Sequence, residues 1–178
     1  MSDESPAPRR PRGAHENAGM HVSAKADYGV RALLVLASSY ADDPSRLVKG
    51  ETIARGQDIP VKFLEGILRE LRQAGLVASQ RGAVGGYRLD RPPHEISIAD
   101  AVRALDGPLA AVRGSKPEDL TYSGHASHLP EVWIAVRSAV RRVLEHISLA
   151  DVVQGDLPPE TLALLAEPGA WQRRASHP

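Results

Sequence analysis

The stretch from residue 59 to residue 91 joins a long helical pattern to a glycine-rich hairpin pattern, and no other part of the chain constrains the fold as strongly. Its first half predicts a helix that stops at Gly75, because apolar residues recur every three or four positions and so share one face. Pro60 suits the first turn, where its missing N–H costs nothing. The predicted buried face consists of Leu64, Ile67, Leu68 and Leu71.

The opposite face of this helix carries polar side chains. A helix with one apolar and one polar stripe can pack on a domain and enter the major groove, which is about 12 Å wide. Gly66 is unusual in this stripe, because a glycine inside a helix costs about 1 kcal/mol relative to alanine. It indicates close approach, either of a neighbouring helix or of a nucleic-acid backbone. The polar stripe consists of Lys62, Glu65, Gly66, Arg69 and Gln73.

After the helix, the sequence predicts two short strands joined by a glycine-rich turn. Gly82, Gly85 and Gly86 allow positive φ at a hairpin tip, and Arg81 and Arg88 flank them. Such a hairpin can reach phosphates or a narrow minor groove, although an ordinary solvated hairpin has the same pattern. The turn matches neither a GxGxxG nor a Walker pattern, which argues against a nucleotide-binding loop.

Two further helices complete the predicted DNA-reading unit, which spans residues 20–91. A short helix at residues 49–56 precedes the long one across a glycine-containing turn, as in a helix-turn-helix. A helix at residues 23–40 begins with Ser23 as its N-cap, where Ser23 and Lys25 could touch phosphate. The predicted fold class is therefore mainly α with a small β-wing: a winged helix-turn-helix domain followed by a long dimerisation helix.

Composition limits the partners and cofactors. The formal net charge is zero, but residues 60–91 carry six basic and three acidic residues, and residues 92–160 carry six basic and ten acidic residues. A basic segment at residues 60–91, joined to an acidic segment at residues 92–160, favours local attraction to phosphate. The absence of cysteine excludes disulfides, thiolate zinc sites and cysteine-ligated iron–sulfur clusters. Neither a span of about 20 apolar residues nor a secretory signal is evident, so we expect a cytoplasmic protein without a membrane partner.

The segments outside the DNA-reading unit are predicted to connect and to assemble. Residues 1–19 are rich in proline and charge, so they are predicted to be a disordered extension. Residues 92–129 are predicted to hold a helix at 96–106, started by a Ser-x-x-Asp capping box, and then a flexible loop. A second Ser-x-x-Asp box opens a short docking helix near residue 148, and residues 156–178 form a C-terminal tail.

A long helix is predicted from Pro130 to Ile147, within an assembly segment at residues 130–155. Its apolar stripe covers more than four turns, and a small winged helix cannot bury all of it. Pairing with a second copy in a two-fold dimer would bury it, and folding back onto the first helix is the monomeric alternative. The predicted dimer contacts are Val132, Trp133, Val136, Val140, Val143, Leu144 and Ile147.

These segments resemble the Rrf2 family of bacterial winged-helix regulators, which includes repressors of the IscR and NsrR type. The resemblance covers about residues 21–155, and its most specific part reads LExxLxxLRxxGLVxSxRGxxGGYxL. It implies a homodimer on a palindromic double-stranded operator, usually a repressor, with Lys62, Phe63, Glu65 and Gly66 at the major groove and Arg81 in the minor groove. The DNA-binding residues expected overall are Ser23, Lys25, Lys62, Phe63, Glu65, Gly66, Arg69, Arg72, Arg81, Gly82, Gly85, Gly86 and Arg88.

One departure from the family pattern concerns the sensor. Cluster-binding members place three cysteines in the segment that corresponds to residues 107–130, and this chain has none. The resemblance is closer to cysteine-less members that control cysteine and sulfur metabolism and respond to a metabolic enzyme or a small molecule. Asp27, His125 and His128 could form a metal site without cysteine, but histidines in a polar loop are more often solvated, so no cofactor is expected.

The leading functional hypothesis is a dimeric, sequence-specific transcriptional repressor. A module that docks a metabolic enzyme is the main alternative, motivated by the acidic region at residues 92–160. A cluster or metal sensor with unusual ligands is a further alternative. An enzyme is disfavoured, because the sequence offers no nucleophile–base pair, phosphate loop or pair of carboxylates in a consistent setting.

Overall fold

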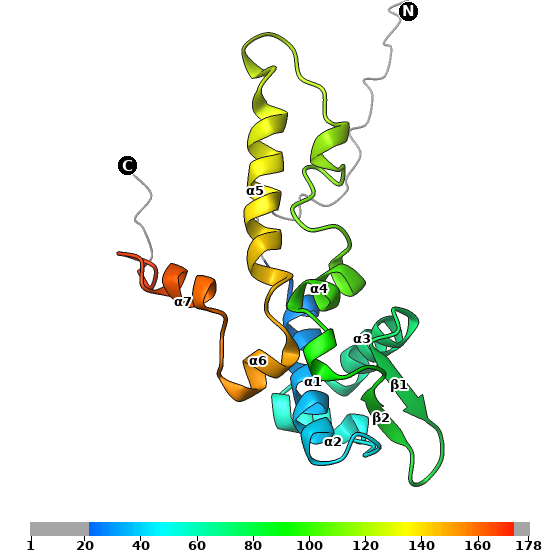
Figure 1. Ribbon diagram of the computed structural model, residues 1–178. Helices are drawn as coiled ribbons and strands as arrows, with labels where there is room; N and C mark the ends of the chain where they lie inside the picture. Colours follow the sequence, from blue (N-terminus) through cyan, green and yellow to red (C-terminus); the bar gives the residue numbers. More distant parts are fainter. Residues whose placement is uncertain (1–21, 173–178) are drawn as a thin grey trace, which may run out of the picture.

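The computed structural model describes residues 22–172, so the extension predicted at residues 1–19 lies outside the described part (Figure 1). A helical body carries a two-stranded hairpin at its side, and one long helix projects away from it. The predicted mainly α fold with a small β-wing is confirmed. The helices are α1 (Ala24–Asp42), α2 (Gly50–Gln57), α3 (Val61–Gln73), α4 (Ile98–Asp106), α5 (Leu129–Leu144), α6 (Leu149–Gln154) and α7 (Pro159–Leu165); the strands are β1 (Val77–Gln80) and β2 (Gly86–Leu89); and three 3-10 turns are η1 (Pro93–Glu95), η2 (Pro117–Asp119) and η3 (Gly124–Ala126).

Helix α1 forms the centre of the body, where it packs against α2, α3, α4, α6 and β2. Its residues Leu33 and Leu36 are almost fully buried. The predicted apolar face of α3 is buried as expected, since Leu64, Ile67, Leu68 and Leu71 are each no more than 1% exposed. Burial of side chains of this size stabilises the fold by about 1.5–3 kcal/mol each, so this face fixes α3 on α1 and leaves its other face outside.

The turn before α3 and the turn after it have left-handed residues at defined positions. Asp58 ends α2 at φ 53°, and Gly75 follows α3 at φ 72°. The Leu76 amide donates to the Leu71 carbonyl at 3.0 Å, which closes the end of α3 in the way that a left-handed glycine permits. The predicted end of the helix at Gly75 agrees with this geometry.

The hairpin is attached to the chain that precedes α2. Strands β1 and β2 are antiparallel, with Val77 opposite Leu89. The amides of Val48 and Tyr87 each donate to the other residue's carbonyl at 2.8 Å. A Cβ on Gly86 would lie 2.7 Å from the Val48 carbonyl oxygen, so this close approach requires glycine. The wing is thereby held beside α3.

Both predicted capping boxes are present, and they lie side by side. Ser97 caps α4 with Asp100, and Ser148 caps α6 with Asp151. The Ile98 amide donates to the Ile147 carbonyl and the Leu149 amide to the Ile96 carbonyl, both at 2.9 Å. These bonds attach the chain that follows α5 to the start of α4.

Helix α5 is shorter than the sequence pattern predicts. It ends at Leu144, and Ile147 lies beyond it, 8% exposed. Ile147 belongs to the core of the chain, because the backbone turns there to pair with residues 96–98. None of the residues in α5 is buried, and the helix contacts η2 and α4 rather than folding back along α1.

The segment between α4 and α5, predicted as a flexible loop, contains η2 and η3. The carboxylate of Glu118 in η2 accepts a hydrogen bond from Arg137 of α5. In the C-terminal region, α7 carries the exposed side chains Leu162 and Leu164. Among residues 22–172, no helix is long and apolar enough to cross a membrane.

Candidate nucleic-acid interface

The outward face of α3 is polar, and no other element of the described part of the chain covers it. Lys62, Glu65 and Arg69 are exposed. A Cβ built on Gly66 would meet nothing within 4 Å. Of the two explanations of this glycine, close packing of a neighbouring helix is therefore wrong for the helices within residues 22–172. The position leaves open space on a face that already carries groups able to donate and accept hydrogen bonds.

The first turn of α3 presents the aromatic side chain of Phe63, which packs against the ring of Tyr28. Phe63 is 45% exposed, and its ring meets the Tyr28 ring edge to face, with centroids 5.8 Å apart. Tyr28 in turn lies under the Arg31 guanidinium, 5.4 Å from its ring centre. This stacking limits the motion of Phe63, so it projects from a fixed place beside the polar stripe.

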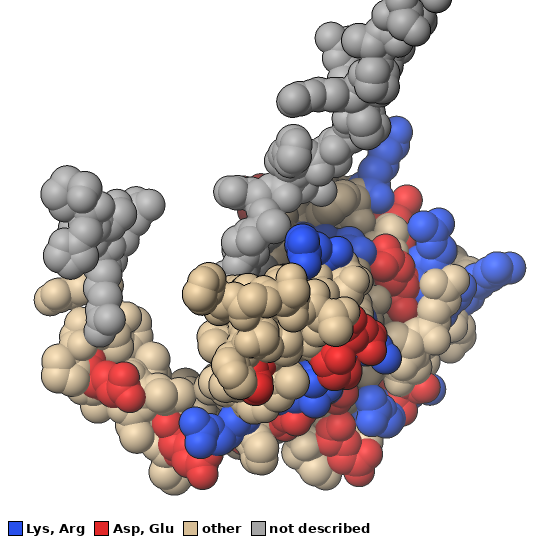
Figure 2. Space-filling view, turned by 90° about the horizontal axis from the view of Figure 1, so that it is seen from above, with Lys and Arg blue, Asp and Glu red and all other residues tan. Residues whose placement is uncertain are grey.

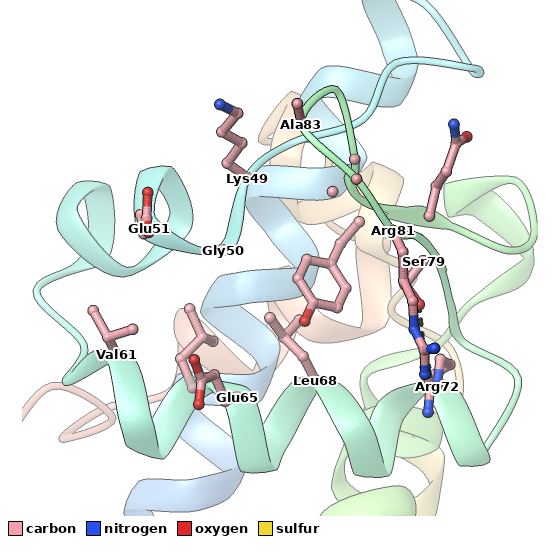
Figure 3. Close-up of a pocket in the computed structure, with 16 residues that line it drawn as sticks. Lys49, Gly50, Glu51, Val61, Glu65, Leu68, Arg72, Ser79, Arg81 and Ala83 are labelled. Carbon is pink, nitrogen blue, oxygen red and sulfur yellow. Dashed lines mark hydrogen bonds between the residues drawn. The ribbon is translucent and has the colours of Figure 1, made fainter.

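A groove of about 450 Å³ separates α3 from the hairpin (Figure 3). Helix α3 forms one wall, the hairpin the other, and the start of α2 closes one end. Arg72 donates to the Ser79 hydroxyl at 3.2 Å and so links the two walls. The predicted residues that line this groove are Glu65, Arg72, Arg81, Gly82, Gly85 and Gly86.

The tip of the hairpin needs its glycines. Gly82 has φ 108°, and a Cβ on Gly85 would lie 2.3 Å from the Gln80 carbonyl oxygen. Arg81 is exposed beside this tip and makes no ion pair within the described part of the chain. Arg88 is half-buried and donates to the Leu89 carbonyl at 3.3 Å. Arg81 is therefore available to an outside anion, whereas Arg88 is partly engaged.

Two of the predicted phosphate contacts are engaged within the chain. Ser23 caps α1 as predicted, accepting from the Ala26 amide at 3.0 Å, and its hydroxyl donates to Asp106 at 2.7 Å. Lys25 pairs with Glu70 of α3 at 3.1 Å. Neither residue lines the groove, so their contact with phosphate stays a prediction.

Lys49 is a basic residue of the groove that the periodicity argument missed. It stands immediately before α2, where its backbone takes the N-cap position, and its exposed side chain lies at the groove's end (Figure 3). A basic residue just before a helix N-terminus was a usable signal, since amide groups there also attract anions. Gln80 and Ser79 of the hairpin line the same groove.

The candidate metal ligands do not come together. Asp27 pairs with Arg31 at 3.3 Å, and His128 lies 3.2 Å from Glu131. The hydrogen bond from His128 lowers the pKa of the Glu131 carboxyl. Within residues 22–172, no group of three His, Asp or Glu side chains could hold a metal ion. Because the chain has no cysteine, its residues do not fit an iron–sulfur cluster held by thiolates.

The comparison with known families agrees with this architecture. Residues 22–155 match the Rrf2 family, described as "Iron-dependent Transcriptional regulator". The chain belongs to the Rrf2 family. An HTH-type transcriptional regulator of Mycobacterium tuberculosis is 48% identical over 158 residues, which cover 89% of this chain and 96% of that protein. The resemblance expected from the sequence is thus confirmed, and no enzymatic family is indicated.

Solved structures of Rrf2 proteins show the same fold. CymR, the global cysteine regulator of B. subtilis, superposes with a TM-score of 0.64 at 34% identity, covering 77% of this chain and 98% of CymR. IscR of T. potens gives a TM-score of 0.61 at 33% identity, covering 86% of this chain and 97% of that one. This Rrf2 protein is therefore a transcriptional regulator with a winged-helix fold.

Proposed function

We propose that this Rrf2 protein is a homodimeric repressor that binds a palindromic DNA operator in the cytoplasm. The observation that carries the proposal is the outward face of α3: a helical glycine facing open space, flanked by exposed Lys62, Glu65 and Arg69. Such a face fits a major groove, because a missing side chain lets the helix approach while its neighbours reach base edges.

The groove between α3 and the hairpin supports contact with two parts of the duplex. With α3 in the major groove, the hairpin would follow the phosphate backbone, and Arg81 would reach the minor groove. Glu65 makes no ion pair with Arg69 in the part of the chain described, so its carboxylate can accept from cytosine N4. The contacts proposed here come from Lys62, Phe63, Glu65, Gly66, Arg69, Arg72, Arg81, Gly82, Gly85, Gly86 and Arg88, with Ser23 and Lys25 as outer phosphate contacts.

Local rather than global charge supports association with DNA. The formal net charge is zero, and basic and acidic side chains are interspersed on the face seen along α5 (Figure 2). Exposed cations near the groove include Lys49, Lys62 and Arg81. Because such cations displace counterions from DNA, binding should fall steeply as salt rises.

The apolar side of α5 supports the dimer. Val132 is 51% exposed, and Val136, Val140 and Val143 are partly buried along the same side. A partly exposed apolar stripe on a projecting helix suits a two-fold contact with the same helix of a second copy. The proposed contacts are Val132, Trp133, Val136, Val140, Val143 and Leu144; Ile147 is left out because it is buried within its own subunit.

Similarity to CymR, the global cysteine regulator of B. subtilis, supports control of sulfur or cysteine metabolism. The chain has no thiolate with which to hold a cluster, and the signal that we propose instead is a small molecule or a partner enzyme. A partner enzyme would make docking part of regulation rather than a separate function.

Fluorescence anisotropy with DNA from the gene's own upstream region tests the proposal. We expect saturable binding to an inverted repeat whose half-sites lie about one helical turn apart, 34–36 Å. Scrambling one half-site should weaken binding far more than changing the spacer sequence. Equal affinity for the intact and scrambled fragments at 150 mM salt would overturn sequence-specific recognition.

A further inference from the structure

A second cavity, of about 400 Å³, lies between the end of α4, the segment that contains η2, and the side of α5 that faces them. Its lining is strongly basic. Arg103 comes from α4, Lys116 from the segment before η2, and Arg137 and Arg141 from successive turns of α5. Glu118 is the single carboxylate in the lining, which gives the wall a charge of +3 in a chain of zero net charge.

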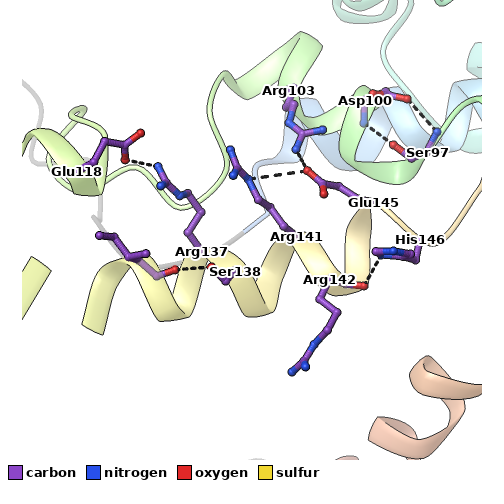
Figure 4. Close-up of polar contacts among 11 residues, drawn as sticks. Ser97, Asp100, Arg103, Glu118, Arg137, Ser138, Arg141, Arg142, Glu145 and His146 are labelled. Atoms are coloured by element: carbon purple, nitrogen blue, oxygen red, sulfur yellow. Dashed lines mark hydrogen bonds and ion pairs between the residues drawn. The ribbon is translucent and has the colours of Figure 1, made fainter. Parts of the chain in front are cut away.

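One side of the cavity is closed by an ion pair. Arg137 donates to Glu118, and the Arg137 side chain is only 14% exposed (Figure 4). Hydrogen bonds from the Glu118 backbone amide and then from Arg137 lower the pKa of the Glu118 carboxyl, so it is ionised at neutral pH. Lys116 stands near this pair but makes no ion pair of its own within residues 22–172.

The other side has two arginines that share one carboxylate. Arg103 donates to Glu145, and the Arg141 Nε atom lies 3.8 Å from the same Glu145 oxygen. Both arginines point toward the cavity side of α5, whereas Arg142 points away from it (Figure 4). Two carboxylates, those of Glu118 and Glu145, therefore lie among four cationic side chains around the cavity. Part of the positive charge has no negative partner within the described residues.

We propose that this cavity binds a small organic anion carrying two or more carboxylate or phosphate groups. Guanidinium groups bind both chemistries through paired hydrogen bonds. Arg137 and Arg141 are one turn apart, about 5–6 Å between Cβ atoms, which matches two acidic groups on one small molecule. The cavity volume lies near the lower end of the range for ligand sites, so a small metabolite fits better than a nucleotide cofactor.

Occupancy of the site is coupled to α5, because the cavity joins three parts of the fold. Helix α4 belongs to the body that carries α3, and its Arg103 contacts the end of α5 through Glu145. An anion competing for Arg137 would release Glu118 and the segment behind it. That segment holds Ala110 at φ 53° and Arg113 at φ 52°, left-handed values that non-glycine residues keep only when their surroundings fix them.

This regulatory step rests on the proposed operator binding; the anion site itself does not. If α5 pairs two copies, its angle to the body sets the spacing of the two α3 helices. An anion that loosens the Glu118 link would change that angle and hence the affinity for an operator of fixed spacing.

Isothermal titration of the full chain with succinate, citrate and inorganic phosphate, each against chloride at equal ionic strength, tests the site. Succinate or citrate should bind saturably and more tightly than inorganic phosphate, which carries a single acidic group. Lys116→Gln should weaken that binding about tenfold, the loss expected for one hydrogen bond to a charged group. Glu118→Gln should strengthen it, because it removes the internal competitor for Arg137. Arg142→Gln, the matched control on the same helix, should leave it within about twofold, as a solvated surface charge contributes little.

Absence of saturable binding for all three anions would overturn the site. Equal weakening by Lys116→Gln and Arg142→Gln would also overturn it, since binding would then follow the surface charge. Operator affinity measured with and without the bound anion tests the coupling: an unchanged affinity overturns the regulatory step and leaves the site standing. A protein that binds the anion but no operator fragment overturns the proposed function instead.

Discussion

Gly66 is a helical glycine that the packing of the described residues does not explain. It lies within α3, has open space where a side chain would extend, and is flanked by exposed polar residues. Gly29 of α1 shows the contrasting case, because a Cβ there would lie 2.1 Å from Leu105 of α4. A side chain at Gly29 would have to displace Leu105, whereas within residues 22–172 no contact requires a glycine at position 66. We therefore expect contact with DNA to offset the cost of Gly66 to helix stability.

Gly66→Ala should make the protein more stable and a poorer DNA binder. Alanine in an exposed helix gains about 0.5–1 kcal/mol over glycine, and thermal unfolding should show the gain. Operator affinity should fall about tenfold, because the new methyl group would hold α3 away from base edges whose contacts provide about 1–3 kcal/mol each.

Gly56→Ala is the matched control, because Gly56 is also helical, meets nothing within 4 Å and lies outside the groove. It should add stability without changing operator affinity. A Gly66→Ala protein that gains stability and binds DNA as tightly as before would show that the duplex does not approach α3 at this position.

At the scale of the elements, the placement of the hairpin depends on a contact that is distant in sequence. Its strands are only four residues each, and the paired bonds between Tyr87 and Val48 hold it beside α3. An isolated two-stranded hairpin is marginally stable in water, so this third strand-like segment matters. The tip can then present Arg81 at a fixed distance from the polar face of α3.

Arg81→Ala should weaken operator binding and lower its salt dependence. Removing one phosphate or minor-groove contact should reduce the slope of log affinity against log salt by about 0.9. The loss should be largest on operators with A·T-rich flanks, where the minor groove is narrow. Arg91→Ala, the same change of charge at the exposed base of the hairpin, should have a much smaller effect. Identical slopes for the two variants, measured by anisotropy from 50 to about 300 mM salt, would remove Arg81 from the interface.

The capping boxes make a prediction about stability alone. Ser97→Ala removes the side chain that accepts from the Asp100 amide at 3.1 Å, and losses of this kind cost about 0.5–2 kcal/mol. Urea denaturation should show that loss. Ser38→Ala on the exposed side of α1 should be neutral or slightly stabilising, because alanine is the better helix former. Equal effects of the two substitutions would mean that the box does not stabilise α4.

Local patterns predicted these elements well and their mutual placement poorly. The buried face of α3, the end at Gly75 and both capping boxes depend on residues close in sequence, so they could be predicted from it. The sequence pattern predicts the end of α5 three residues too late, because apolar periodicity continues to Ile147 while backbone pairing with residues 96–98 ends the helix earlier. Lys49 in the groove and the convergence of Arg103 with Arg137 depend on tertiary contacts that no local pattern records.

At the scale of the whole molecule, α5 carries an apolar side that the described part of the chain leaves partly exposed. It has 16 residues, none of them buried, and its valine side runs along most of its length. At 1.5 Å per residue the helix is about 24 Å long, enough for three to four layers of side chains between two paired helices. Its other side is engaged by η2 through Arg137, so we propose that the valine side is the one that contacts a second copy.

Val136→Glu should convert the proposed dimer into a folded monomer. The substitution places a carboxylate at the middle of the valine side, and burying an unpaired charge costs about 3–5 kcal/mol, more than 100-fold in the association constant. Since α5 has no buried residue within its own subunit, circular dichroism should show an unchanged helix content. Light scattering should report half the mass of the unmodified protein, and operator affinity should drop because each half-site is then bound alone. Ser138→Glu adds the same charge on the opposite side of the helix, where Ser138 is exposed, and should leave both mass and affinity intact. If Val136→Glu remains a dimer, or if Ser138→Glu dissociates as readily, the valine side of α5 is not the surface that joins two copies.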